Sequence, residues 1–158
     1  MPNLNDKPFW IVEGTKSEKL FVEKYGKVLG VDINPAKRDN PYVIDMVTDT
    51  GMLADLKTQS TPFKSSDRKW GIPPDMCFTF DEYSALRYHF YHASAIWIYL
   101  WVRHVKPERV YRVFMHDLRI YMLTRAKIHI QDARKDLPSQ NRAVYVLDLR
   151  DHIFKQVI

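Results

Sequence analysis

Cysteine is nearly absent from this sequence, and glycine is scarce. Cys77 is the one cysteine among 158 residues, so neither an intramolecular disulfide nor a cysteine-based zinc cage can form, and a reducing cytosol is the expected setting. The 5 glycines, set against 46% hydrophobic and 13% aromatic residues, exclude a collagen-like or disordered chain. A packed α/β or α+β fold is expected instead.

The sequence also lacks a long apolar run. No stretch approaches the roughly 20 residues that a membrane span needs. Residues 1–7 are polar and lack the apolar centre of a signal peptide. We therefore expect a protein of the cytoplasm that has no membrane partner.

The net charge suggests a class of partner, and the chain length suggests the number of domains. Lysine and arginine number 24 against 19 acidic residues, which gives a net charge of +5, so a polyanion such as nucleic acid is a plausible partner. A chain of 158 residues is close to the usual size of one domain. We predict a single domain over residues 1–158 with one active centre.

The pattern over residues 15–29 predicts a helix. Thr15 or Ser17 supplies an N-cap, and Gly30 follows the last apolar pair as a C-terminal stop. At 100° per residue, Glu18 falls on the apolar side of this helix, so its side chain is expected to point along the buried face. The apolar residues that share its side are Phe21, Val22, Tyr25, Val28 and Leu29.

Residues 42–59 predict a β-hairpin. Residues 42–48 and 52–59 have strand composition, and Asp49-Thr50-Gly51 between them fits a three-residue loop with glycine in the left-handed region. This loop length sets the register, and counting back from it places Asp45 directly opposite Asp55.

One face of the second predicted strand is polar. Alternate side chains of a strand share a face, so Asp55, Lys57 and Gln59 stand together, with Asp45 opposite. Two carboxylates that face each other repel, so the arrangement calls for cations, which a divalent metal and Lys57 would supply. Magnesium suits this site because it prefers oxygen ligands and commonly uses only one or two carboxylates.

The rest of the chain completes an α/β pattern, with a central mixed sheet flanked by helices. Residues 64–74 predict an exposed basic loop, and residues 95–102 predict a strand covered on both faces. The other expected elements are a helix over 81–92, a strand over 110–115, a helix over 116–129, a strand over 143–149 and a short terminal helix.

The hairpin with the preceding helix resembles the PD-(D/E)xK nuclease superfamily. The matching residues are Asp45, the tripeptide Asp55-Leu56-Lys57, and Gln59, together with Glu18 on the helix before them. Residues 15–59 carry this signature. It departs from the usual pattern where Ile44 replaces the common proline and where the acid-x-lysine has its Asp form. The resemblance implies a restriction-endonuclease-like core.

It also implies the role of each residue. Lys57 would orient or deprotonate the attacking water, and Gln59 would position the lysine or the water. The expected product is a cleaved DNA phosphodiester, made by an endonuclease that uses Mg²⁺, with Mn²⁺ as a substitute, in a bacterium or a phage-infected cell. The implied metal ligands are Asp45, Asp55, Glu18 and Leu56.

Several alternatives stay open at this stage. The polar strand face is also compatible with the solvated outer side of an ordinary hairpin, and Glu18 with a capping box that closes on Thr15. Gln59 is also typical of a polar strand end. The whole chain is compatible with a noncatalytic domain that binds nucleic acid or protein.

Basic residues that follow the hairpin are candidates for DNA contact. A homodimer that cuts both strands is compatible with the sequence. The candidates after the hairpin are Lys64, Arg68 and Lys69, and those farther along the chain are Arg103, Lys106, Arg109 and Arg112.

Overall fold

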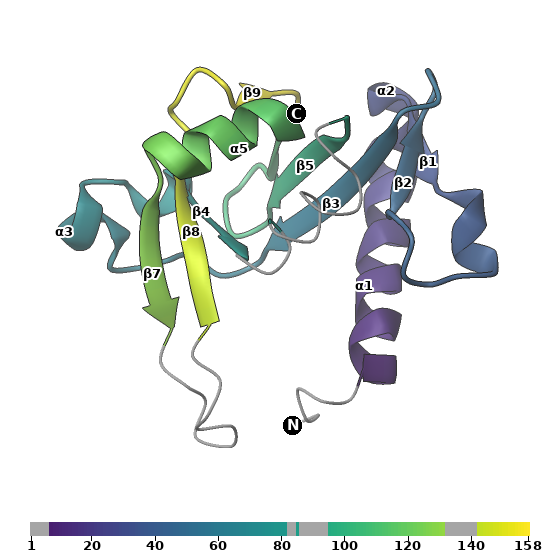
Figure 1. The fold of residues 1–158 in the computed structure, drawn as a ribbon, viewed down its shortest axis with the longest axis horizontal. Coiled ribbons are helices and arrows are strands. Elements are labelled where there is room, and N and C mark those ends of the chain that lie inside the picture. Colours follow the sequence, from purple (N-terminus) through teal and green to yellow (C-terminus); the bar gives the residue numbers. More distant parts are fainter. Residues whose placement is uncertain (1–6, 82–84, 86–94, 132–141) are drawn as a thin grey trace. The chain divides into compact units, whose positions relative to one another are not determined.

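The computed structural model describes residues 7–81, 85, 95–131 and 142–158 (Figure 1). The chain forms two compact units, Met1–Leu56 and Lys57–Ile158, and each is described by itself. Both contain helices and strands, which confirms the predicted α/β class with a mixed sheet and flanking helices. The single-domain organisation stays a prediction. The predicted helix over residues 81–92 lies largely outside the described residues.

The first unit begins with a longer helix than predicted. Helix α1 (Lys7–Phe21) continues into the π-helical segment η1 (Val22–Gly26) and then α2 (Lys27–Leu29). The predicted start near residue 15 is therefore wrong. The predicted end is confirmed, because Gly30 follows α2 with a φ of 65°, the left-handed conformation that closes many helices.

The π-helical turn changes which residues face the interior. Glu18 and Phe21 are buried, as predicted from the helical pattern. Val28 was expected on the same side, but it is 75% exposed. A π-turn takes up one residue more than an α-turn, so every residue after η1 is rotated relative to the α-helical count. Gly26 is buried in place of Val28.

Two strands and the beginning of a third complete the first unit. Strands β1 (Val31–Ile33), β2 (Met46–Thr48) and β3 (Leu53–Gln59) are antiparallel neighbours in that order, and β3 continues past Leu56 into the second unit. Figure 1 shows α1 beside β1 and β2. A 3₁₀-helix, η2 (Pro35–Arg38), lies between β1 and β2 in the chain.

The predicted hairpin and its register are confirmed. Met46 pairs with Ala54 and Val47 with Leu53, and the three-residue loop ends at Gly51, whose φ is 82°. The first strand is shorter than predicted, since the chain still turns at Asn40, whose side chain accepts the Tyr42 N–H at 3.0 Å. Strand β2 therefore begins at Met46 rather than at residue 42.

The second unit contains two sheets of antiparallel pairs. Strand β5 (Trp97–Val102) pairs with β6 (Arg109–Phe114), which also pairs with β9 (Lys155–Gln156). In the other sheet β8 (Arg142–Asp148) lies between β4 (Cys77–Asp81) and β7 (Lys127–Gln131). Five consecutive residues of β5 are at most 1% exposed, which confirms the predicted covered strand. The remaining elements are α3 (Ser66–Trp70), the 3₁₀-helix η3 (Pro74–Met76) and helix α5 (Met115–Thr124).

Three predictions for the second unit need correction. The helix expected over 116–129 ends at Thr124, and its last residues belong to β7. The expected terminal helix is a turn followed by β9. The 64–74 segment is only partly the exposed loop that was predicted: five of its eleven residues are exposed, and it contains α3, which ends at Gly71 in the left-handed region with a φ of 67°.

Candidate functional site

The predicted acidic residues lie on three neighbouring pieces of the first unit. Glu18 lies on α1, Asp45 directly precedes β2, and Asp55 lies in β3. Asp55 is only 2% exposed and Glu18 is 7% exposed. The interpretation of this face as the solvated outer side of a hairpin is therefore wrong for Asp55. A buried carboxylate loses its hydration, so it is retained only where charges or hydrogen bonds stabilise it.

The hairpin register brings Asp45 beside β3. Met46 pairs with Ala54, and Asp45 directly precedes Met46, in a bend outside the paired residues of β2. The Asp45 Oδ2 atom also accepts the Leu56 N–H at 3.2 Å, so the carboxylate leans toward β3. Lys57 follows two residues after Asp55 on the same strand and is half-buried. Alternation along β3 puts Asp55 and Lys57 on the same face of that strand, and the face that they are expected to share with Asp45 stays a prediction.

Lys37 is part of this site, although the sequence pattern did not indicate it. Its Nζ atom lies 2.5 Å from Glu18 Oε2 and 2.9 Å from Asp45 Oδ1. The side chains of all three residues are at most 18% exposed. One ammonium group thus joins two of the predicted metal ligands.

Asn34 explains how Lys37 reaches this position. The Asn34 side-chain oxygen accepts the Ala36 N–H at 3.1 Å and so caps η2. The Asn34 Nδ2 atom donates to the Ile44 carbonyl at 2.9 Å, and the Asn34 N–H donates to the Asp45 carbonyl at 3.0 Å. One residue therefore starts the 3₁₀-helix that carries Lys37 and holds it against the segment that carries Asp45.

The electrostatics of Lys37 favour its charged form. Burial by itself opposes a charged ammonium group, but the negative charges of Asp45 and Glu18 and their hydrogen bonds outweigh that effect. The pKa of Lys37 is consequently raised above its ordinary value of 10.5. Lys37 is a permanent cation at neutral pH.

The capping-box interpretation of Glu18 is wrong. Thr15 lies in the interior of α1 rather than at its start, so it is not the N-cap. Glu18 points instead to Lys37. The misinterpretation arose because a Thr-x-x-Glu pattern has the same sequence inside a helix as at its beginning.

The residues present fit a magnesium ion that has few protein ligands. Among the residues that the structure describes, no three His, Cys, Asp or Glu side chains are grouped as a metal site. Magnesium commonly uses one or two carboxylates and completes its shell with water and substrate phosphate oxygens. Asp45 and Asp55 would be these carboxylates. The seating of a cationic ammonium on Asp45 is consistent with a position that attracts positive charge. Leu56 has an apolar buried side chain, so only its backbone carbonyl could ligate.

Gln59 has a position of its own in the second unit. Its side chain is buried, its Nε2 atom donates to the Cys77 carbonyl at 3.1 Å, and its Oε1 atom accepts the Thr79 N–H at 2.9 Å. Both ends of the amide are thus bonded to the backbone of the β4 segment. These contacts hold the end of β3 beside β4, which agrees with the interpretation of Gln59 as a structural polar residue.

The three basic candidates after the hairpin are all exposed. Lys64 precedes α3, and Arg68 and Lys69 lie within it. The Lys69 Nζ atom lies 5.8 Å from the ring centroid of Phe63 and 5.6 Å from that of Trp70. Cations beside aromatic rings are a common feature of surfaces that bind single-stranded nucleic acid.

Three of the later cations contact the protein itself. The Arg103 guanidinium lies over the Trp101 ring, and that of Arg112 lies over the Trp97 ring. Arg109 forms an ion pair with Asp75 at 3.2 Å. These contacts explain their positions without a nucleic acid.

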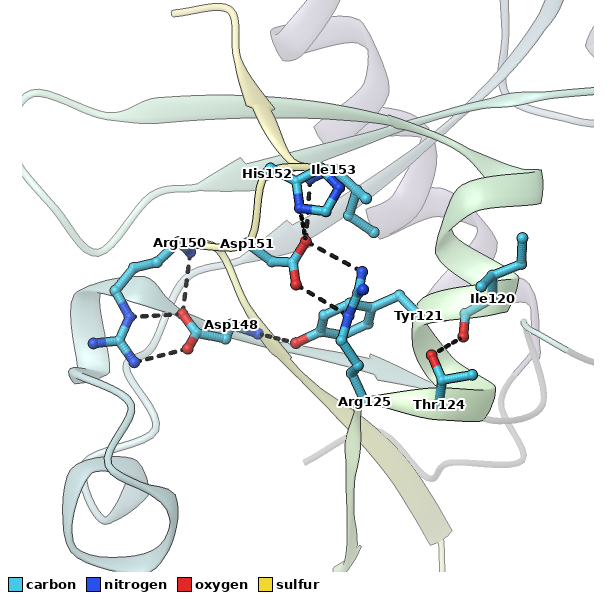
Figure 2. Close-up of polar contacts among 9 residues, drawn as sticks. All are labelled: Ile120, Tyr121, Thr124, Arg125, Asp148, Arg150, Asp151, His152 and Ile153. Carbon is cyan, nitrogen blue, oxygen red and sulfur yellow. Dashed lines mark hydrogen bonds and ion pairs between the residues drawn. The ribbon is translucent and has the colours of Figure 1, made fainter.

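A second charged cluster joins the C-terminal turn to α5 (Figure 2). The Asp148 carboxylate accepts hydrogen bonds from the Arg150 guanidinium at 2.8 and 2.7 Å, and Arg125 pairs with Asp151 at 3.1 Å. The Asp148 N–H donates to the Tyr121 hydroxyl at 2.9 Å. Each carboxylate faces its own guanidinium, and both arginine side chains are nearly half exposed. We call these residues the C-terminal charge cluster.

The comparisons with known proteins give limited information. No protein-family model and no curated protein match the sequence. The chain is similar to a solved structure described as "D212, a nuclease from a fusselovirus", with 11% identity over 99% of this chain and 89% of that one and a TM-score of 0.46. At such identity and TM-score, the likeness carries no argument for an activity. Within the described part of the chain, no helix has the length and apolar character needed to cross a membrane.

Proposed function

We propose that the chain is a magnesium-dependent endonuclease that hydrolyses DNA phosphodiester bonds, with Asp45, Asp55 and Lys57 at its centre. The observation that supports this proposal is that Asp45, whose carboxylate accepts the Leu56 N–H, lies beside the strand that carries the nearly fully buried Asp55. A pair of facing carboxylates is destabilising unless it serves to bind positive charge. The resemblance to the PD-(D/E)xK pattern gives this arrangement its chemical interpretation.

Asp45 and Asp55 would hold the metal, with Glu18 and the Leu56 backbone carbonyl as the further oxygen ligands. When bound, magnesium supplies positive charge to a phosphate oxygen and to the attacking water. Lys57 lies on the same strand face, where its ammonium would hold the water and stabilise the charge that develops on the phosphate. Mn²⁺ would substitute for Mg²⁺, since both accept oxygen ligands in octahedral geometry.

The DNA partner is proposed on charge and exposure. The net charge is +5, and Lys64, Arg68 and Lys69 are exposed on or beside α3. Such side chains neutralise phosphates without reading the base sequence. We also propose that the protein acts in the cytoplasm and that two copies form a homodimer that cuts both DNA strands.

The direct test is cleavage of plasmid, linear, single-stranded and branched DNA with and without magnesium. Asp55→Asn and Lys57→Met should both abolish cutting, because each removes a charge at the site and largely preserves side-chain size. The matched control is Thr58→Ala, an exposed residue that alternates away from Asp55 and Lys57 on the same strand, and this variant should cut like the wild type. Cutting that survives both site variants would contradict the assignment.

A noncatalytic DNA-binding domain is the second candidate. It is favoured by the Lys37 ammonium, which satisfies Glu18 and Asp45 without a metal. This candidate predicts binding to DNA in the presence of a chelator, loss of binding on charge reversal of Arg68 and Lys69, and no cleavage with any divalent metal. Magnesium-dependent cutting would exclude it.

A further inference from the structure

Two predicted metal ligands already share a cation that belongs to the chain. Lys37 Nζ lies within hydrogen-bond distance of both Glu18 Oε2 and Asp45 Oδ1, at 2.5 and 2.9 Å. The three side chains are 12%, 9% and 18% exposed, so water screens their charges only partly. Lys37 is outside the acid-x-lysine pattern, and the proposed function gives it no role.

Asp45 is the residue where the ammonium and a metal would meet. Its Oδ2 atom accepts a backbone N–H, and its Oδ1 atom accepts the Lys37 ammonium. A carboxylate has about four lone-pair positions, so the neutral N–H leaves room for another partner. The ammonium differs because its positive charge repels a divalent cation at close range in a poorly screened site.

The position of Lys37 would allow its ammonium group to move away from the two carboxylates. It lies on the short 3₁₀-helix η2, and its neighbours Pro35, Ala36 and Arg38 on that helix are exposed. A lysine side chain has a flexible four-carbon stem and three donors that rotate freely. The ammonium can therefore leave the two carboxylates for solvent while Asn34 keeps the helix in place.

We infer that Lys37 is the built-in counter-ion of the Glu18–Asp45 pair, and that a divalent cation binds at these carboxylates by displacing the Lys37 ammonium. The inference rests on the proposed function, because it concerns the same metal site. It assigns Lys37 as a positioning residue that keeps the acidic residues in place in the metal-free protein and sets the metal affinity.

The test is calorimetric titration of the full chain with Mn²⁺ alone and with Mg²⁺ alone, in the absence of DNA. Lys37→Gln should bind either metal about tenfold more tightly than the wild type, because the competing cation is gone. Arg38→Gln is the matched control, since it removes the same charge from the next residue of η2. It should change the affinity by less than about twofold. Equal or weaker binding by Lys37→Gln would overturn the inference.

Thermal unfolding covers the case in which the variant is unstable. Lys37→Gln should melt at a lower temperature than the wild type in a chelator, and Mn²⁺ should raise its melting temperature more than that of the wild type. Lys37→Arg keeps a cation and should bind metal no more tightly than the wild type. A Lys37→Gln protein that stays unfolded at saturating Mn²⁺, or a Lys37→Arg protein that binds metal tightly, would overturn the inference.

Parallel cleavage assays separate this inference from the nuclease proposal. If the wild type cuts DNA but Lys37→Gln gains no affinity, the counter-ion role fails and the nuclease stands. If Lys37→Gln gains affinity but no protein cuts DNA, the counter-ion role stands and the nuclease fails.

Discussion

The two charged clusters of this chain differ in balance and in burial. In the first unit, Glu18 and Asp45 share the ammonium of Lys37, and all three side chains are largely shielded from water. In the C-terminal charge cluster, Asp148 has Arg150 and Asp151 has Arg125, with both arginines nearly half exposed. Two shielded carboxylates that share one ammonium group form the site at which we propose that a divalent cation competes. Balanced, exposed pairs indicate surface structure.

Energetics make the same distinction. Removing one partner from a buried ion pair leaves an uncompensated charge, which costs several kcal/mol, whereas exposed pairs contribute little. Changes to the Glu18, Asp45 and Lys37 side chains are therefore expected to affect stability more than changes to the C-terminal charge cluster.

The largest expected contrast is in activity. Asp45→Asn removes a proposed metal ligand and should lower magnesium-dependent DNA cleavage by at least about a hundredfold, whereas Asp151→Asn, the same change in the C-terminal charge cluster, should alter it less than about twofold. Cleavage rates at saturating Mg²⁺ measure both. Comparable losses in the two variants would remove the distinction between the clusters.

The next contrast is in stability without metal. Lys37→Met should lower the free energy of unfolding by about 3 kcal/mol in the presence of a chelator, because it leaves two shielded carboxylates without their cation. Arg125→Met should cost about 1 kcal/mol or less, since that pair is exposed and screened. Urea denaturation at low and high salt checks both values. A Lys37 effect that disappears in 1 M salt would place it among the surface pairs.

A smaller effect on stability is expected when the 3₁₀-helix that carries Lys37 loses its cap but Lys37 keeps its charge. Asn34→Ala removes the cap of η2 and the side-chain bond to Ile44, so the free energy of unfolding should fall by about 1 kcal/mol. Asn40→Ala is the control, because Asn40 makes one exposed turn contact with Tyr42. Denaturant unfolding of both proteins gives the comparison. An equal loss of unfolding free energy in the two variants would show that Asn34 does not hold η2 in place.

The smallest expected effect is the pH dependence of the C-terminal charge cluster. The hydrogen bond from Arg150 lowers the pKa of Asp148, with its backbone N–H and charge acting in the same direction. The stabilisation is therefore present above the unfolded-state pKa of about 4 and is lost as the pH falls below it. Asp148→Asn should be less stable than the wild type near pH 7, and the two should converge toward about pH 2. A difference that is independent of pH would contradict the ionic origin.

Much of the first unit could be predicted because its signals are local. The three-residue loop that ends in Gly51 determined the hairpin register, in which Met46 pairs with Ala54. Gly30 marked the helix end correctly for a similar reason. Turn geometry depends on a few adjacent residues, so composition is enough to recognise it.

The errors came from features that the local sequence pattern does not indicate. The π-helical segment η1 rotated Val28 out of the predicted buried face, and no residue pattern predicted it. The helix predicted over 116–129 ends at Thr124, and Lys127–Gln131 instead form β7 by pairing with β8. Strand pairing depends on residues that are distant in the chain, which a local pattern does not contain.

The sequence by itself determined the α/β class and the hairpin, since strand periodicity and loop length act over few residues. Only the tertiary structure decided that Asp55 is buried, that Glu18 is no helix cap, and that Lys37 joins Glu18 to Asp45. Lys37 lies 19 residues from Glu18 and 8 from Asp45. No periodicity relates positions at those separations, and only the packing of α1, η2 and the hairpin brings their charges together.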